Sequence, residues 1–269
     1  MNILLIGDII GQPGRVVMER EVIRLREERA IDLVVANCEN VAGGAGVTPR
    51  TAEDLFRAGV DVLTSGNHVW RKREALELLK LDPRVLRPAN YPDGTPGTGS
   101  TIVETLSGHK VGVLNVMGRV FMEPLDCPFR AAERELARLK LVTSVIIVDM
   151  HAEATSEKVA MGWFLDGKVS AVFGTHTHIP TADERILPQG TAFITDVGMT
   201  GPYDSVIGRR VDQILERFLS NRPVKSDVAE GNVQLRGLLV DVDQATGKAK
   251  AVERITRTLD GAVAARGRD

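Results

Sequence analysis

The sequence predicts an α/β fold, and two observations carry that prediction. Short runs rich in Val, Ile and Leu have the length and composition of buried strands in a mainly parallel sheet. Longer segments between them mix apolar and charged residues, as helices covering such a sheet do. With 269 residues, the chain is long enough for a substantial core, so we expect a single domain over residues 1–269.

Strands and helices are expected to alternate along most of the chain. The first strand precedes a Gly/Pro turn at 11–14 and a helix over 15–29, whose Arg15 we expect to face solvent. Thr48 and Pro49 form a typical helix start, with Thr48 as N-cap. The remaining elements expected along the chain are helices at 49–57, 71–80, 129–140 and 156–164, strands at 111–116 and 168–173, and a long surface connection at 81–100.

The carboxyl-terminal part predicts a different kind of pairing. Residues 234–242 and 249–255 alternate apolar and polar side chains around a Gly-containing turn, which indicates an antiparallel hairpin. A chain that starts as parallel βαβ and ends with antiparallel strands fits two mixed sheets. We therefore expect a four-layer α/β-β/α sandwich, with the sheets packed face to face and helices outside.

Composition narrows the class of protein. Hydrophobic residues make up 43% and charged residues 26% of the chain, and the net charge is -2, so a partner such as long nucleic acid is disfavoured. No apolar run approaches the roughly 20 residues that span a bilayer, and no signal-peptide pattern opens the chain. The two cysteines, Cys38 and Cys127, do not form a disulfide framework. We expect a cytoplasmic protein that does not enter membranes.

Five apolar runs end in side chains that can hold a metal. The carboxyl ends of parallel strands meet at one edge of a sheet, where ligands bind. We therefore expect these side chains to converge on a metal site. They are Asp8 after the first run, Glu39 and Asn40 after the second, Asn67 and His68 after the third, His151 after the fourth, and His176 and His178 after the fifth.

The pair His176 and His178 is the most specific part of this pattern. Alternate residues of an extended segment point the same way, so both rings could reach one site. Imidazole, carboxylate and amide ligands without clustered thiolates suit first-row transition metals. A carboxylate can bridge two cations, and two adjacent ions are the arrangement that supports phosphoryl displacement.

The order of these motifs resembles that of the calcineurin-like metallophosphoesterases, and within them the YmdB-type branch. Gly7-Asp8, Gly66-Asn67-His68 and the late His176-Thr177-His178 follow the family order, and the resemblance extends to about Tyr203. The segments 7–15, 37–40 and 149–158 match the YmdB-type branch in particular. Ile10 and Glu39 stand where the wider superfamily usually has a histidine and a bridging aspartate, which agrees with this branch.

The resemblance implies a ligand set and a reaction. It places Asp8, Glu39, Asn40 and His178 around one ion. It places Glu39, Asn67, His151 and His176 around the other, with Glu39 shared. His68 would be the catalytic residue that assists the leaving oxygen. Members of the family are two-metal phosphodiesterases reported to act on cyclic nucleotides.

We therefore expect a phosphodiesterase that uses two iron or manganese ions to hydrolyse small phosphodiesters, with 2′,3′-cyclic nucleotides as the expected substrates. A metal-dependent amidohydrolase is the alternative enzyme, but its His-x-His generally follows the first strand, where this chain has Asp8. A regulatory protein that senses a nucleotide or metal with little turnover also stays open. The exposed edge of the expected carboxyl-terminal hairpin favours self-association as a homo-oligomer.

Overall fold

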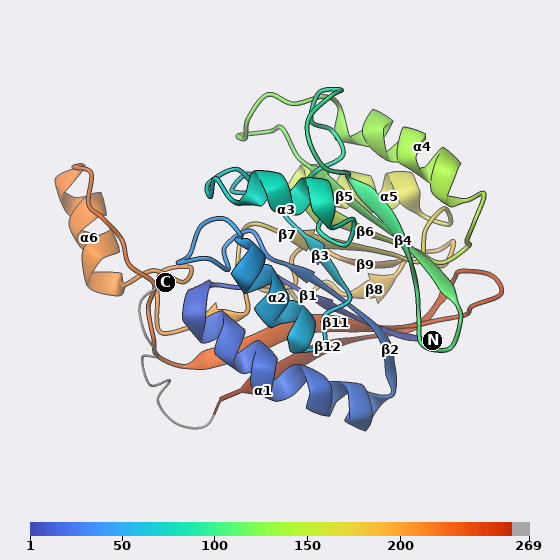
Figure 1. Ribbon diagram of the computed structural model, residues 1–269, viewed down its shortest axis with the longest axis horizontal. Helices are drawn as coiled ribbons and strands as arrows, with labels where there is room; N and C mark the ends of the chain where they lie inside the picture. Colours follow the sequence, from blue (N-terminus) through green and yellow to red (C-terminus); the bar gives the residue numbers. More distant parts are fainter. Residues whose placement is uncertain (260–269) are drawn as a thin grey trace.

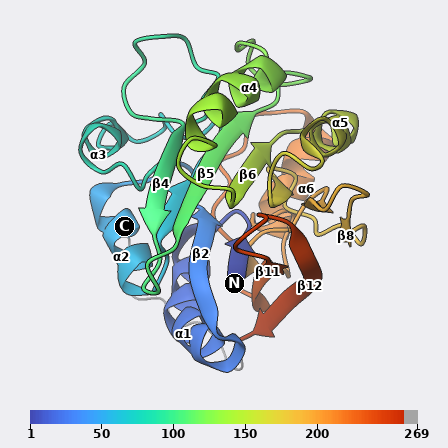
Figure 2. The ribbon, with the colours of Figure 1, turned by 90° about the vertical axis from the view of Figure 1, so that its right-hand side faces the viewer.

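Two β-sheets lie face to face at the centre of the molecule, and helices cover their outer surfaces (Figures 1 and 2). The computed structural model describes residues 1–259, so the last ten residues of the predicted domain, 260–269, lie outside the described part of the chain. Within that part, no helix is both long enough and apolar enough to cross a membrane.

The first sheet combines the amino-terminal strands with the carboxyl-terminal hairpin. Its strand order is β10-β11-β1-β2-β3, and β12 pairs with β11 as well. The β1–β2 and β2–β3 pairs are parallel, while β11 runs antiparallel to β1, β10 and β12. The strands are β1 (Asn2–Ile6), β2 (Ile31–Asn37), β3 (Val62–Thr64), β10 (Gly201–Pro202), β11 (Val233–Val242) and β12 (Ala249–Thr258).

The second sheet has the order β4-β5-β6-β7-β9-β8. Its four central strands are parallel, and the edge strands β4 and β8 pair antiparallel with their neighbours. The strands are β4 (Ser100–Glu104), β5 (Lys110–Met117), β6 (Ile146–His151), β7 (Ala171–Thr175), β8 (Arg185–Ile186) and β9 (Ala192–Ile194). The expectation of two mixed sheets is confirmed.

The apolar core forms three layers between and outside the sheets. On β1, Ile3 and Leu5 join the cluster between the two sheets, which also contains Phe173 of β7. Leu4 and Ile6 point the other way and join the cluster that the helices on the outer face complete. A third cluster lies between the second sheet and its helices. Alternation along the strands thus produces the four-layer α/β-β/α sandwich.

Six helices are present among the described residues. Helix α2 runs over the predicted residues, and Thr48 caps it through a reciprocal capping box with Thr51. Figure 1 shows α1 and α2 on the outer side of the first sheet and α4 and α5 on that of the second. The helices are α1 (Gly11–Arg29), α2 (Pro49–Arg57), α3 (Ala75–Leu81), α4 (Pro128–Leu139), α5 (Thr155–Leu165) and α6 (Val211–Ser220).

Some local expectations were wrong. Helix α1 begins at Gly11 rather than Arg15. Pro13 lies in its first turn and does not break the helix there, because backbone N–H groups in the first turn have no partner inside the helix. Helix α3 begins at Ala75, four residues later than expected. Helix α6 was not expected; it projects from the body of the molecule and buries Ile214 (Figure 1).

Candidate metal centre

The predicted site residues come together at the carboxyl ends of β1, β2, β3, β6 and β7. Parallel strands of the two sheets carry their following residues to a common edge. Side-chain contacts of 3.9 Å or less connect the whole predicted set. The set consists of Asp8, Glu39, Asn40, Asn67, His68, His151, His176 and His178.

Four of these side chains form what we term the His151 group: Glu39, Asn67, His151 and His176. The Nε2 atom of His151 lies 3.2 Å from Glu39 Oε2, 3.2 Å from Asn67 Oδ1 and 3.1 Å from His176 Nδ1. Atoms bound about 2.1 Å from one cation in tetrahedral or octahedral geometry lie roughly 3.0–3.4 Å apart. The spacing of this group therefore fits the donor atoms of a metal ion.

The remaining ligand candidates form the His178 group: Asp8, Glu39, Asn40 and His178. Asp8 is fully buried, and its Oδ1 has no hydrogen-bond partner within residues 1–259. This oxygen lies 3.8 Å from His178 Nε2 and 3.9 Å from His151 Nδ1. A buried carboxylate oxygen without a donor is costly unless a cation neutralises it. Its environment therefore suits a metal ion.

Hydrogen bonds to the second ring nitrogen orient two of the three histidines in these groups, His151 and His178. His178 Nδ1 donates to the Ile207 carbonyl at 3.0 Å, which leaves the Nε2 lone pair on the side of Asp8 and Asn40. His151 Nδ1 lies 2.8 Å from Thr175 Oγ1, and its Nε2 faces the His151 group. Fixing one nitrogen in this way selects the tautomer that can bind a metal.

Asn40 connects the His178 group to His68. Its Oδ1 accepts from His68 Nδ1 at 2.7 Å, and its Nδ2 lies 3.2 Å from both Glu39 Oε1 and His178 Nε2. His68 is half-buried, and its backbone N–H donates to Glu39 Oε2 at 3.1 Å. His68 thus contacts two of the predicted ligands, Glu39 and Asn40, directly.

Burial and neighbouring charges shift the pKa values of the cluster in different directions. Burial lowers the pKa of His151, but the carboxylates of Glu39, Asp8 and Asp149 together outweigh burial and raise this pKa to about 9. Burial likewise opposes ionisation of Glu39, yet His151 holds the pKa of Glu39 below its ordinary range. Burial raises the pKa of Asp8, and burial beside His151 lowers the pKa of His176 to about 3. A metal ion bound by His151 would have to displace the proton that this raised pKa favours.

The backbone of the late histidines differs from the expectation. We expected an extended segment with both rings on one face, but strand β7 ends at Thr175, and His176 and His178 have φ angles of 93° and 67°. These left-handed conformations direct the two rings apart: His176 toward His151 and His178 toward Asp8. The rings therefore serve different groups.

Glycine at position 66 is required by the closeness of the His151 group. A Cβ atom there would lie 2.1 Å from His151 Nε2 and 2.5 Å from Glu39 Oε2, closer than nonbonded atoms approach. The Gly66-Asn67-His68 turn can pass beside His151 and Glu39 because Gly66 has no side chain.

The sequence analysis did not predict the buried polar network that lies behind His151. Thr175 Oγ1 donates to Asp149 Oδ1 at 2.7 Å, Thr64 Oγ1 donates to Asp149 Oδ2 at 2.5 Å, and Asp149 is fully buried. The signal available was Asp149 two residues before His151, because alternate strand residues share a face. This network fixes His151 through Thr175.

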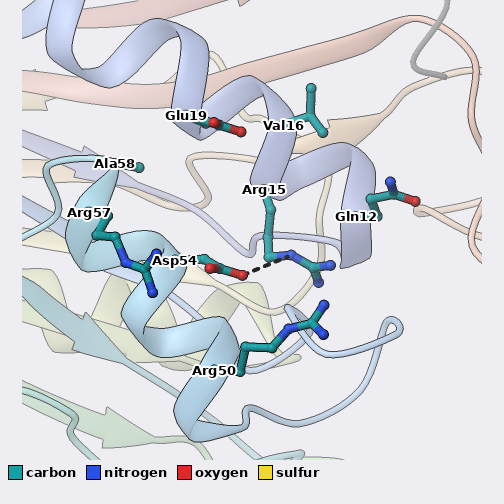
Figure 3. A pocket seen from close by; sticks show the side chains of 8 residues that line it. All are labelled: Gln12, Arg15, Val16, Glu19, Arg50, Asp54, Arg57 and Ala58. Atoms are coloured by element: carbon teal, nitrogen blue, oxygen red, sulfur yellow. Dashed lines mark ion pairs between the residues drawn. The ribbon is translucent and has the colours of Figure 1, made fainter. Parts of the chain in front are cut away.

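A separate cavity of about 310 Å³ lies between α1 and α2 (Figure 3). Its lining includes Arg15, Arg50 and Arg57, and the Arg15 side chain is only 11% exposed. Arg15 donates to the Val41 carbonyl and lies 3.9 Å from Asp54, so the expectation of a solvent-facing side chain was wrong. It braces the loop after Glu39 and Asn40.

The chain is similar to a phosphatase and a phosphodiesterase over most of its length. The fold matches that of solved phosphoesterases, and one solved relative is described as a novel phosphatase from Mycoplasma pneumoniae. That structure is 35% identical, covers 96% of this chain and 93% of its own, and has a TM-score of 0.89. The family described as YmdB-like protein matches residues 4–255, so the chain belongs to that family.

Two further relatives are more similar in sequence. A 2′,3′-cyclic-nucleotide 2′-phosphodiesterase of Bacillus subtilis (strain 168) is 48% identical, with 95% of this chain and 96% of that protein covered. A hypothetical protein from Thermus thermophilus has a solved structure that is 43% identical, with 96% of this chain and 99% of that chain covered and a TM-score of 0.90. These findings confirm the predicted family, fold and enzyme class, a phosphoric diester hydrolase.

Proposed function

We propose that this protein is a two-metal phosphodiesterase that hydrolyses small phosphodiesters, with 2′,3′-cyclic nucleotides as its substrate class. The observation that carries the proposal is the shared position of Glu39 between the two ligand groups. Its Oε2 lies 3.2 Å from His151 Nε2, and its Oε1 lies 3.2 Å from Asn40 Nδ2. The name of the 48% identical relative supports the substrate class.

The His151 group and the His178 group would each hold one ion. Their nitrogen and oxygen donors, without any thiolate, suit iron or manganese. When bound, the two ions would neutralise charge on the phosphoryl group and lower the pKa of the water that attacks phosphorus. The unpartnered Oδ1 of Asp8 and the spacing around His151 Nε2 support this assignment.

His68 would act on the leaving oxygen of the diester. Its side chain is 28% exposed, so substrate can reach the ring, while Asn40 fixes its Nδ1. Burial lowers the pKa of His68, which makes its protonated ring a stronger acid. Proton donation from Nε2 to the departing oxygen, as the bond from that oxygen to phosphorus breaks, would leave His68 neutral.

The test combines metal analysis with turnover. The purified protein is loaded with Mn²⁺ or Fe²⁺ and assayed on bis-p-nitrophenyl phosphate and on 2′,3′-cyclic nucleotides. We expect two ions per chain and hydrolysis of both substrates, and an Asp8→Asn variant that loses an ion and at least about 100-fold in rate. Tight nucleotide binding without turnover in the fully metallated protein would instead support a sensing function.

We also propose a cytoplasmic location and self-association as a homo-oligomer. Cys38 and Cys127 are free thiols, which suits a reducing compartment. Size-exclusion chromatography with light scattering measures the oligomeric state directly.

A further inference from the structure

A buried ion pair lies behind the late histidines and belongs to neither ligand group. Lys158 of α5 is 1% exposed and Asp196, just after β9, is fully buried. Lys158 Nζ donates to Asp196 Oδ2 at 2.7 Å. Lysine is almost never buried this deeply, because desolvating its charge is costly even when the charge is paired. A pair retained at that cost calls for a reason beyond stability.

Both members of the pair bind Thr177, the residue between the two histidine ligands. Asp196 Oδ2 accepts from Thr177 Oγ1 at 2.6 Å and from the Thr177 backbone N–H at 3.2 Å. Lys158 Nζ also lies 3.3 Å from Thr177 Oγ1. The second oxygen of Asp196 accepts from the Gly198 backbone N–H at 2.7 Å. The carboxylate thus holds both Thr177 and the adjoining segment.

The conformation held in this way is one that the backbone does not favour. His176 and His178 both have positive φ angles, which non-glycine residues adopt only when their surroundings impose it. The same conformations send the two rings to different ligand groups. Two rings from one short segment can reach both groups only if the residue between them is fixed.

We propose that Lys158 and Asp196 are positioning residues that hold Thr177, and through it direct His176 and His178 to the two ion positions. This inference rests on the proposed metal site. It implies that loss of the Thr177 contacts weakens both ions together, whereas loss of one ligand removes mainly one. Partners behind metal ligands typically change metal affinity by about 10–100-fold.

Thr177→Val tests the inference while leaving the ion pair in place. Valine has the shape of threonine but cannot donate to Asp196, and Thr177→Ser keeps the hydroxyl and is the matched rescue. Mn²⁺ binding to the full chain is measured by isothermal titration calorimetry, and electron paramagnetic resonance reports whether the two ions are adjacent. We expect Thr177→Val to bind both ions at least about 10-fold more weakly, with Thr177→Ser near wild type.

A second pair of variants addresses the ion pair itself. Lys158→Met together with Asp196→Asn removes both buried charges, so neither is left unpaired and folding is expected to survive. Circular dichroism checks the fold, and Lys168→Met, an exposed lysine beyond the same helix, is the control. We expect the double variant to bind Mn²⁺ about 10–100-fold more weakly and to lose the spectroscopic signature of adjacent ions.

The outcomes separate the two proposals. Wild-type protein that binds no Mn²⁺ would overturn the proposed function and this inference with it. Wild-type protein that binds two ions, with a Thr177→Val variant and a double variant that bind both ions equally well, would overturn only the inference. In that case Lys158 and Asp196 would be a structural pair.

Discussion

His151 and His178 are supported in different ways. His151 is the last residue of β6, fully buried, and Thr175 fixes its ring from within the same sheet. His178 lies beyond its strand in a left-handed turn, and the carbonyl that fixes its ring belongs to Ile207, which is 48% exposed. Regular strands hold ligands more rigidly than loops do. His176 lies in the same turn as His178, but the His151 group also has a strand-held imidazole that the His178 group lacks. The His151 group is therefore expected to bind its ion more tightly than the His178 group.

The largest effect is expected where the His151 group has no room to adjust. Gly66→Ala would place a methyl group against His151 and Glu39, so both ligands must move. We expect the rate of diester hydrolysis to fall about 100-fold, since displacement of reacting groups by about 1 Å has that effect. Steady-state kinetics on bis-p-nitrophenyl phosphate measures the loss.

Gly112→Ala is the control for that substitution. A Cβ atom at Gly112 of β5 would meet its nearest neighbours at 3.4 Å, an ordinary contact. If Gly66→Ala were as active as Gly112→Ala, the side chains of the His151 group would be able to shift without loss of activity. That result would contradict the rigidity expected of this group.

An intermediate effect is expected behind His151. Thr175→Val removes the hydroxyl between His151 and Asp149 but keeps the side-chain shape. Because the ring loses its orienting partner, we expect the tighter Mn²⁺ affinity to fall about 10-fold while the weaker one changes less. Calorimetric titration resolves the two affinities, and Thr175→Ser should restore the first. Equal weakening of both ions would remove the distinction between the groups.

The smallest effect is expected at the exposed side of His176. Glu153 Oε2 lies 3.2 Å from His176 Nε2, but the Glu153 side chain is 50% exposed. Contacts of this kind contribute little in water, so Glu153→Gln should change Mn²⁺ affinity by less than about fivefold. A loss of about 100-fold in the same titration would mean that Glu153 is a ligand, and the His151 group would need to include it.

The sequence was sufficient where regular strands determine position. Asp8 and Glu39 follow parallel strands of one sheet and His151 ends a parallel strand of the other, so strand direction predicts the edge of the sheet at which each lies. The packing of the two sheets then brings these edges together. The hairpin of β11 and β12 was predictable for the same reason, because period-two alternation defines a strand face.

Other features depend on tertiary contacts that local patterns do not contain. The left-handed turns at His176 and His178 are held by residues far along the chain, such as Asp196 and Ile207. Lys158 lies one turn before Met161 on the buried face of α5, a position that propensity would give to an apolar residue. The sequence pattern does not predict that Lys158 is buried, because its partner Asp196 lies 38 residues later in the chain.

Anomalous diffraction from a crystal loaded with Mn²⁺ tests the central claim most directly. We predict two adjacent peaks with Glu39 bound to both, His151 and His176 at one, and Asp8 and His178 at the other. At limiting Mn²⁺ the first of these peaks should be the stronger. A single peak, or two peaks that do not share Glu39, would contradict the account.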